Sequence, residues 1–238
     1  MTEYVTTDRG DRVAYDRYGS GPALVFVAGA GPHRASDPVT TATAQAVAAT
    51  GATTIVFDRL GRGESVADGV LDLDRELTAI RALLDVAGGS AVLCGHSSGC
   101  SIALRAAADG LPVTGLALWE APIAGDPAEA TAWVAEFLRR LDAGELESAL
   151  EQYMKDMPPE WLERALSSPQ TVTQTVSLRA DAESLAWAEM IESAELIASA
   201  VPGARALRVP GAFHSWEPGP MAAVLSELLA TTAARSAH

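Results

Sequence analysis

Short apolar runs alternate with helix-like segments through the first half of this chain of 238 residues. The runs are rich in valine, leucine and isoleucine, which is typical of strands that are buried on both faces of a sheet. Strands that alternate with helices in this way favour a mostly parallel, doubly wound sheet with helices on both faces. The four expected strands are Ala23–Ala28, Thr53–Phe57, Ala91–Cys94 and Val113–Trp119.

The segments around these strands complete the expected core. Polar and apolar residues alternate over 11–18, which predicts a half-exposed strand, and Arg205–Val209 is expected to be a last short strand. Apolar spacing and terminal glycines predict four helices. These helices are Thr40–Thr50, Leu71–Ala87, Ser98–Asp109 and Met221–Leu229.

From residue 128 to residue 190 the pattern changes to helices only. Trp133, Phe137 and Leu141 share one face of the first of these helices, so that face is expected to pack against other apolar residues. A helical insertion after the carboxyl end of a strand would cover a site there. We therefore predict a core of residues 1–127 and 191–238 with an inserted helical cap, 128–190, in a single overall domain, which suits a chain of this length.

Composition excludes several classes of function. The formal charge of −14 disfavours nucleic acid as a partner, because an acidic surface repels phosphates. No basic segment followed by an apolar run begins the chain, and no apolar run reaches the ~18 residues that span a bilayer. We therefore expect a cytoplasmic protein without a membrane partner. Cys94 and Cys100 make neither a disulfide framework nor a metal-ligand pattern.

The strongest chemical signal is the pentapeptide Gly-His-Ser-Ser-Gly at 95–99, between an apolar strand and an alanine-rich helix. A tight strand–turn–helix connection presents the central serine above the sheet, and the two glycines let backbone segments approach closely. A serine hydroxyl is a weak nucleophile at neutral pH and needs an adjacent base. The motif predicts that Ser97 is a catalytic nucleophile.

The order of motifs along the chain resembles the α/β-hydrolase superfamily over nearly its whole length. The motifs are Gly-Ala-Gly at 29–31, Asp-Arg-Leu-Gly-Arg-Gly-Glu-Ser at 58–65, the serine pentapeptide and Gly-Ala-Phe-His at 211–214. The segment Trp-Glu-Ala-Pro at 119–122 is similar to a bacterial branch that carries Tyr-Glu-Pro-Pro there. Gly61 and Gly63 are interpreted as turn residues, and the neighbouring Asp58 and Arg59 as loop architecture.

The resemblance places the catalytic base on a late loop, where His214 stands. His33 is the next candidate, whereas His96 beside the nucleophile is expected to pack. The resemblance also places two backbone N–H donors around the oxyanion, one on Ser98 and one on Ala30. The family loop usually reads His-Gly-x, but here it reads Ala-Gly-Ala, so the backbone donor remains without the usual histidine.

The acid that orients the histidine has two candidates. In the superfamily it follows a seventh strand, and no clean strand of this kind precedes Arg205, so we expect that strand to be lost. Glu120 directly follows the sixth strand, where haloalkane dehalogenases place a catalytic glutamate, and it is the preferred candidate. Asp181 follows Val-Ser-Leu at 176–178, which would be a degenerate seventh strand.

These residues predict a serine hydrolase that acts on a small-molecule ester, thioester or lactone through Ser97, His214 and Glu120, with no metal and no organic cofactor. Serine at position 97 argues against the dehalogenases and epoxide hydrolases, whose relatives use aspartate there. The alternatives are a cyclase, lyase or epimerase on the same fold, and a non-catalytic binding protein.

Arg34 is a candidate to bind a substrate carboxylate, although a solvent-facing arginine is more common. Substrate identity and oligomeric state stay open.

Overall fold

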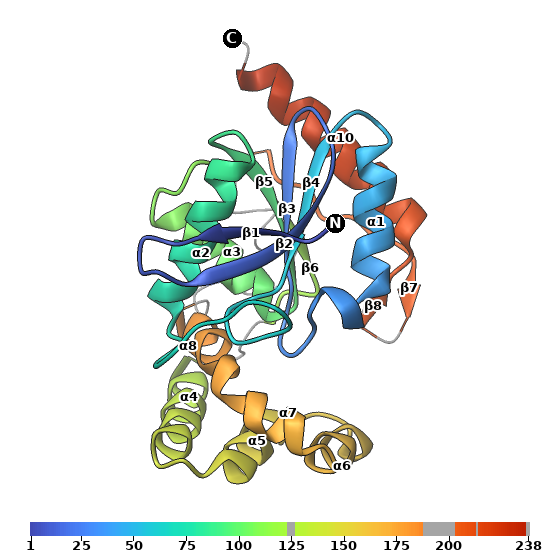
Figure 1. The fold of residues 1–238 in the computed structure, drawn as a ribbon. Coiled ribbons are helices and arrows are strands. Elements are labelled where there is room, and N and C mark those ends of the chain that lie inside the picture. The colour runs from blue at the N-terminus through green and yellow to red at the C-terminus, as the bar shows by residue number, and fades with distance from the viewer. Residues whose placement is uncertain (123–126, 188–202, 213, 237–238) are drawn as a thin grey trace.

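The computed structural model describes residues 1–122, 127–187, 203–212 and 214–236. A six-stranded sheet in the order β1-β2-β4-β3-β5-β6 forms its centre (Figure 1). Strands β3, β4, β5 and β6 run parallel, while β2 pairs antiparallel with both β1 and β4. The strands are β1 (Glu3–Thr6), β2 (Arg12–Gly19), β3 (Ala23–Val27), β4 (Thr53–Phe57), β5 (Ala91–His96) and β6 (Val113–Trp119).

The four strands that the apolar runs predicted are confirmed, as is the half-exposed strand at 11–18. All five residues of β3 are buried, because helices cover both faces of the sheet. β6 is only partly buried along its length, which fits its place at the edge of the sheet. The mostly parallel α/β architecture follows from this arrangement.

Helices cover the two faces of the sheet in pairs (Figure 1). Two apolar cores result, one between the sheet and α2 with α3, and one between the sheet and α1 with α10. Side chains cap α1 and α2: the carboxylates of Asp37 and Asp72 accept hydrogen bonds from the N–H groups of Thr40 and Arg75. The helices are α1 (Pro38–Ala48), α2 (Leu73–Val86), α3 (Ser98–Ala108) and α10 (Pro218–Ser236).

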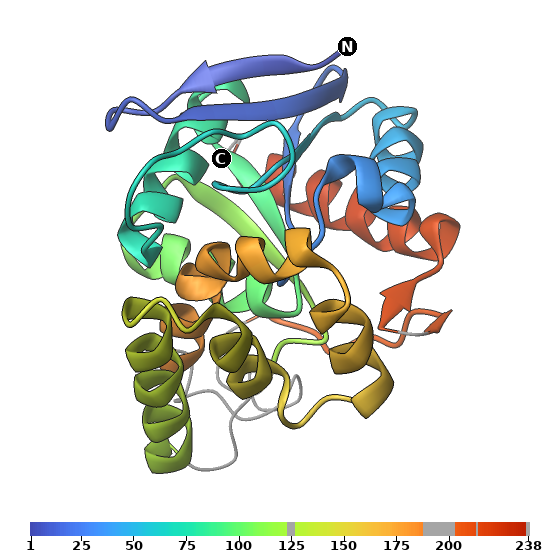
Figure 2. The ribbon, with the colours of Figure 1, turned by 60° about the horizontal axis from the view of Figure 1, so that its bottom comes forward.

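A group of helices at one end of the sheet has its own apolar core. Phe137, Leu150 and Tyr153 lie buried there, and Figure 2 shows this yellow to orange group in front of the sheet. The helices are α4 (Pro127–Asp142), α5 (Leu146–Met154), α6 (Pro159–Leu166), α7 (Pro169–Gln174) and α8 (Arg179–Trp187), with a 3-10 turn η2 (Thr175–Leu178). Residues 188–190, where the expected cap ends, lie outside the described residues.

One expected strand is wrong, and the alternative seventh strand at 176–178 does not form. Arg205–Val209 forms no strand: Leu207 is 53% exposed, and Arg205 pairs with Glu227 of α10 instead of entering the sheet. Residues 176–178 belong to η2, because their backbone continues the helical path of α7 into α8. Among the described residues no strand follows β6 in the main sheet, which agrees with the expected loss of the seventh strand.

A short hairpin of β7 (Gly211–Ala212) and β8 (Ser215–Trp216) follows instead and carries His214 in its loop. Trp216 anchors this hairpin, since its ring is buried and its indole N–H donates to Thr43 Oγ1 over 2.8 Å. None of the described helices is long and apolar enough to cross a membrane.

Candidate active site

Ser97 occupies a strained turn between β5 and α3. Its backbone φ of 52° and ψ of −129° lie outside the region that a residue with a side chain prefers. Two backbone hydrogen bonds hold the turn: Ser97 N–H donates to Trp119 O over 2.9 Å, and Cys100 N–H donates to Ser97 O over 2.8 Å. The turn therefore depends on β6 as well as on its own strand and helix.

The two glycines of the pentapeptide allow the close approach that this turn needs. A β-carbon on Gly95 would lie 2.7 Å from Cys100 N, and one on Gly99 would lie 2.1 Å from Val27 O. Both distances are too short for a real side chain, so each position requires glycine. These contacts agree with the prediction that the two glycines let backbone segments approach closely.

Glu120 and His214 meet beside this turn. The Glu120 carboxylate contacts Nδ1 of His214, and the two side chains are 45% and 42% exposed. Glu120 immediately follows β6 and has a φ of 49°, whereas His214 has a φ of 60°. With Ser97, they are the only non-glycine residues of the described chain that have a positive φ. Such backbone strain gathers at functional sites, because the surrounding structure must hold it there.

His96 packs against His214, as the sequence suggests. Its Nε2 lies 2.9 Å from the His214 carbonyl oxygen, and the two ring centroids are 4.8 Å apart. Burial and the neighbouring His214 lower the pKa of His96 below its ordinary value. His96, Glu120 and His214 are the one group of three potential metal ligands among the described residues. Nδ1 of His214 already contacts Glu120, and Nε2 of His96 already contacts the His214 carbonyl oxygen, so we assign no metal there.

The loop after β3 lies directly against the serine turn. A β-carbon on Gly29 would lie 2.9 Å from the Ser97 side chain, so the backbone of this loop passes close to the nucleophile. Ala30 follows Gly29 and lines the same cavity as Ser97. On the other side of Ser97, Ser98 is buried at the first position of α3, where helix N–H groups have no partner within the helix. Both expected oxyanion donors are thus next to Ser97.

Ser97 and His214 line a common cavity of about 280 Å³. The described residues around it include no Asp, Glu, Lys or Arg, so its only titratable side chains are His96, His214 and Tyr153. No hydrogen bond between Ser97 Oγ and His214 is present among the described residues, and such contacts often tighten only when substrate binds. The outer wall is mostly apolar and comes from Leu150, Tyr153, Met154, Met157, Trp161, Ala165 and Leu178.

The sequence matches the model of the alpha/beta hydrolase family over residues 24–236. The chain belongs to this family. Comparison with curated protein sequences gave no match. Family membership makes the protein an enzyme with a hydrolase fold and a small-molecule substrate.

Solved structures are similar to this alpha/beta hydrolase along its length. An alpha/beta hydrolase from Sphaerobacter thermophilus is 27% identical with a TM-score of 0.72, and the match covers 94% of this chain and 99% of that one. A thermophilic esterase from Thermogutta terrifontis is 18% identical with a TM-score of 0.63, over 98% and 99% of the two chains. A hydrolase from Pseudomonas aeruginosa is 20% identical with a TM-score of 0.64, over 95% and 97%. The last two likenesses concern the fold.

Asp181 lies in a different environment from Glu120. It is fully buried, and its carboxylate accepts hydrogen bonds of 2.5 Å from both Arg59 and Arg62. Burial acts to raise the pKa of Asp181, but the two guanidinium groups more than offset this effect, so the pKa lies below its ordinary value. The described contacts of Asp181 do not include His214. The sequence analysis does not predict this cluster, although two arginines three positions apart in one loop, Arg59 and Arg62, could have indicated a buried acidic partner.

Arg34 is not at the mouth of the cavity. Its side chain is 8% exposed and forms ion pairs with Asp16 at 3.0 Å and Asp58 at 3.1 Å. Two carboxylates therefore already hold the guanidinium. Both the expected role in binding a substrate carboxylate and the alternative of a solvent-facing side chain are wrong, because the loop folds back onto β2 and β4.

The two thiols are buried beside the serine turn. Burial raises the pKa of Cys94 to about 12, and burial also raises the pKa of Cys100. Both thiols stay protonated at neutral pH and behave as small apolar side chains.

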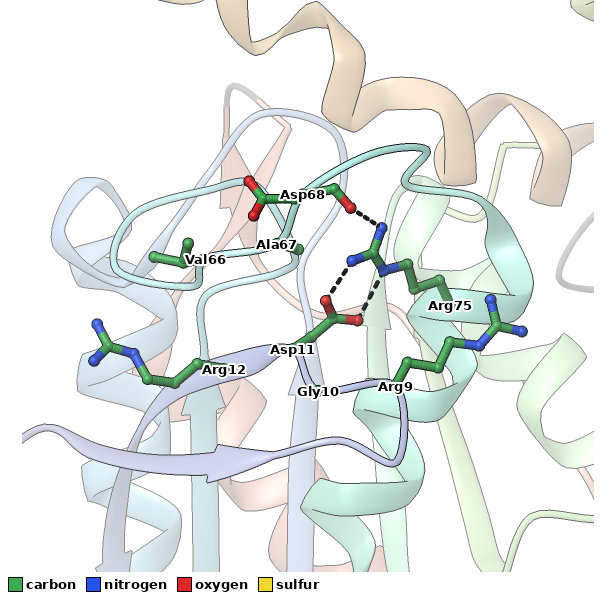
Figure 3. Close-up of a pocket in the computed structure, with 8 residues that line it drawn as sticks. All are labelled: Arg9, Gly10, Asp11, Arg12, Val66, Ala67, Asp68 and Arg75. Atoms are coloured by element: carbon green, nitrogen blue, oxygen red, sulfur yellow. Dashed lines mark hydrogen bonds and ion pairs between the residues drawn. The ribbon is translucent and has the colours of Figure 1, made fainter.

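A larger hollow of about 460 Å³ lies beside the β1–β2 turn (Figure 3). Arg75 points across it to the carboxylate of Asp11 and to the backbone oxygen of Asp68. Arg9 instead pairs with Asp72, and Arg12 lies over the ring of Tyr4. Each of the three arginines of this hollow thus already contacts a neighbouring group, so the hollow does not compete with the cavity at Ser97.

Proposed function

We propose that this alpha/beta hydrolase is a serine hydrolase that cleaves a small, uncharged ester, thioester or lactone. The observation that carries the proposal is that the three non-glycine residues with a positive φ among the described residues are the same three that form the proposed triad. Ser97, Glu120 and His214 all have a positive backbone φ, and two of them line one cavity while the third contacts His214. A purely structural cluster has no need to place three strained residues around an apolar cavity.

The reaction proceeds in two steps. Ser97 Oγ attacks the carbonyl carbon, and His214 takes the hydroxyl proton at Nε2, since Nδ1 faces Glu120. The N–H groups of Ala30 and Ser98 hold the negative oxygen of the tetrahedral intermediate. His214 then returns the proton to the leaving alcohol or thiol as the acyl–oxygen or acyl–sulfur bond breaks. Water repeats the same steps on the acyl-enzyme, which releases the acid and restores Ser97.

The cavity supports an uncharged substrate. Its described lining carries no acidic or basic side chain other than histidine, and the net charge of −14 repels anions at long range. A volume of about 280 Å³ is at the small end for ligand cavities, which suits a short acyl group. Helices α5 and α6 supply much of the apolar wall, so we also propose that the inserted helices act as the cap of the active site.

A fluorophosphonate probe tests this function directly. The activated phosphorus should form a covalent bond to Ser97 Oγ with loss of fluoride, and mass spectrometry of the labelled peptide would place it. Ser97→Ala should abolish labelling and ester turnover, whereas the neighbouring Cys100→Ala should retain both. Folded wild-type protein that remains unlabelled at Ser97 would contradict the proposal.

One observation favours a second candidate, a non-hydrolytic enzyme such as a cyclase, lyase or epimerase. Ser97 Oγ and His214 share no hydrogen bond among the described residues, so a histidine that acts on substrate directly is also consistent with the geometry. Turnover in ¹⁸O-labelled water separates the two candidates. A hydrolase introduces the label into the acid product, whereas a cyclase, lyase or epimerase does not.

A further inference from the structure

A buried ionic cluster contacts the two segments that carry the proposed oxyanion donors, which are the loop after β3 and the start of α3. Asp181 is on α8, and its carboxylate binds Arg59 and Arg62 from the loop after β4. The three side chains are at most 1% exposed, so each charge depends on its partners. Arg59 also binds Glu76 at 2.9 Å, which balances two positive charges with two negative ones.

Arg62 extends this cluster to the loop at Gly29. Its Nη1 donates to the Gly29 carbonyl oxygen over 2.6 Å, and Arg59 Nη1 lies 3.4 Å from the same oxygen. The Gly29 carbonyl and the Ala30 N–H belong to one planar trans peptide unit, so they point in opposite directions. Because the carbonyl points at the buried arginines, the N–H of Ala30 is turned away from them. Ala30 itself lines the cavity that Ser97 lines, on the side away from these arginines.

Asp181 reaches the second donor as well. The hydroxyl of Ser98 donates to Asp181 Oδ1 over 2.6 Å. Ser98 is the first residue of α3, so this bond fixes the start of the helix that directly follows Ser97. One carboxylate therefore holds both residues that carry the proposed oxyanion donors: Ser98 directly, and Ala30 through Arg62 and the Gly29 carbonyl.

We propose that Asp181 and Arg62 are positioning residues of the oxyanion hole, which aim the N–H groups of Ser98 and Ala30 at the reacting carbonyl without touching substrate. This inference rests on the proposed function. A cluster that served only to attach α8 to the core would need ion pairs alone. Here Arg62 Nη1 also donates to the carbonyl oxygen of the peptide that carries the Ala30 N–H, and the Ser98 hydroxyl donates to Asp181. Preorganised donors cost no reorganisation during the reaction, which is why their exact aim affects kcat.

Two variants test the tethers separately. Arg62→Lys keeps the charge but cannot reach Asp181 and the Gly29 carbonyl together, and Ser98→Ala removes one hydroxyl while its backbone N–H remains. Each should lower kcat by about 10-fold or more, below the 10²–10³-fold that accompanies loss of a whole donor, with KM within about threefold of wild type. Ser98→Ala removes no charge, so it keeps the test open if Arg62→Lys does not fold.

A trifluoromethyl ketone gives a readout that a structural defect would not produce. Attack of Ser97 on this ketone forms a hemiketal whose oxygen needs the same two N–H groups. Its affinity should fall by the same factor as kcat in each variant, while a secondary alcohol of equal size, which forms no such oxygen, should bind as to wild type.

Glu76→Gln is the matched control. It disturbs the same cluster through Arg59, whose Nη1 lies 3.4 Å from the Gly29 oxygen against 2.6 Å for that of Arg62, and no hydrogen bond joins Glu76 itself to Gly29 or Ser98 among the described residues. It should lower the melting temperature and leave both kcat and ketone affinity within about twofold of wild type.

Three results would overturn the inference. If Arg62→Lys and Ser98→Ala keep wild-type kcat and ketone affinity, the tethers do not position the donors. If Glu76→Gln reduces both as strongly as they do, general destabilisation explains the loss. A wild-type protein that reacts with neither the fluorophosphonate nor the ketone would remove the proposed function and this inference with it, whereas a reactive wild type with unaffected variants removes the inference alone.

Discussion

The Glu120 carboxylate contacts Nδ1 of His214, and each of these residues holds a left-handed backbone conformation. A non-glycine residue in this conformation costs roughly 1–3 kcal/mol, so the surrounding structure must stabilise it. The loop after β6 and the β7–β8 hairpin thus bring together two side chains that are far apart in the sequence.

Glu120→Gln should lower kcat by about 10²-fold with little change in KM. The amide keeps the shape of the side chain but cannot stabilise the imidazolium charge, and it can favour the wrong tautomer. Steady-state kinetics with an aryl ester would measure this loss. Glu217→Gln, which alters an exposed acid directly after β8, is the control and should stay near wild type. Equal activity of the two variants would return Glu120 to a structural role.

His214→Ala should reduce kcat/KM by at least ~10³-fold, because Ser97 then has no base to take its proton. His33→Ala is the comparison, since the His33 ring lies 3.0 Å from Ser36 Oγ in an outer turn and does not line the cavity. Near wild-type turnover in His214→Ala would show that a group other than His214 takes the proton from Ser97.

Trp161→Ala should shift the preferred acyl chain to greater length. Trp161 lines the cavity and is 40% exposed, so its side chain lies where the cavity opens to solvent. A longer acyl chain would have to pass this side chain. Each further buried methylene contributes about 0.8 kcal/mol, or about fourfold in kcat/KM. A series of p-nitrophenyl esters from acetate to decanoate measures the change. An unaltered profile would place the acyl group on another wall of the cavity.

The pH dependence of stability should contain a contribution from His96. Because the folded-state pKa of His96 is lowered, the unfolded chain binds this proton more readily. The contribution is fully present above about pH 6.5, the ordinary histidine value, and is lost as the pH falls from there toward the folded-state pKa. The slope for one proton cannot exceed about 1.4 kcal/mol per pH unit.

Chemical denaturation between pH 5 and pH 7.5 measures this contribution. His96→Gln should flatten the curve below pH 6.5, whereas His33→Gln should follow wild type. A wild-type slope that persists in His96→Gln would assign the titration to another group.

Local signals in the sequence determine the strands and the serine turn. Apolar runs locate β3, β4 and β5 because a strand that is buried on both faces needs mostly apolar residues, and a further run at 113–119 locates β6 at the edge of the sheet. The pentapeptide at 95–99 identifies the turn because close approach of backbone segments requires glycine at both ends. These constraints act within one segment, so they can be recognised without knowledge of the fold. The 205–209 strand failed because apolar character alone does not supply a neighbour to pair with.

Only the tertiary structure decides the partners of the charged residues. The sequence favours Glu120 over Asp181 as the acid but does not exclude Asp181, whereas in the fold one contacts His214 and the other is buried between Arg59 and Arg62. Arg62 and Asp181 are 119 positions apart, and neither residue type specifies a partner at that distance. A charge becomes costly to leave unpaired only when the fold removes it from water, so its pairing is settled by burial and not by local sequence.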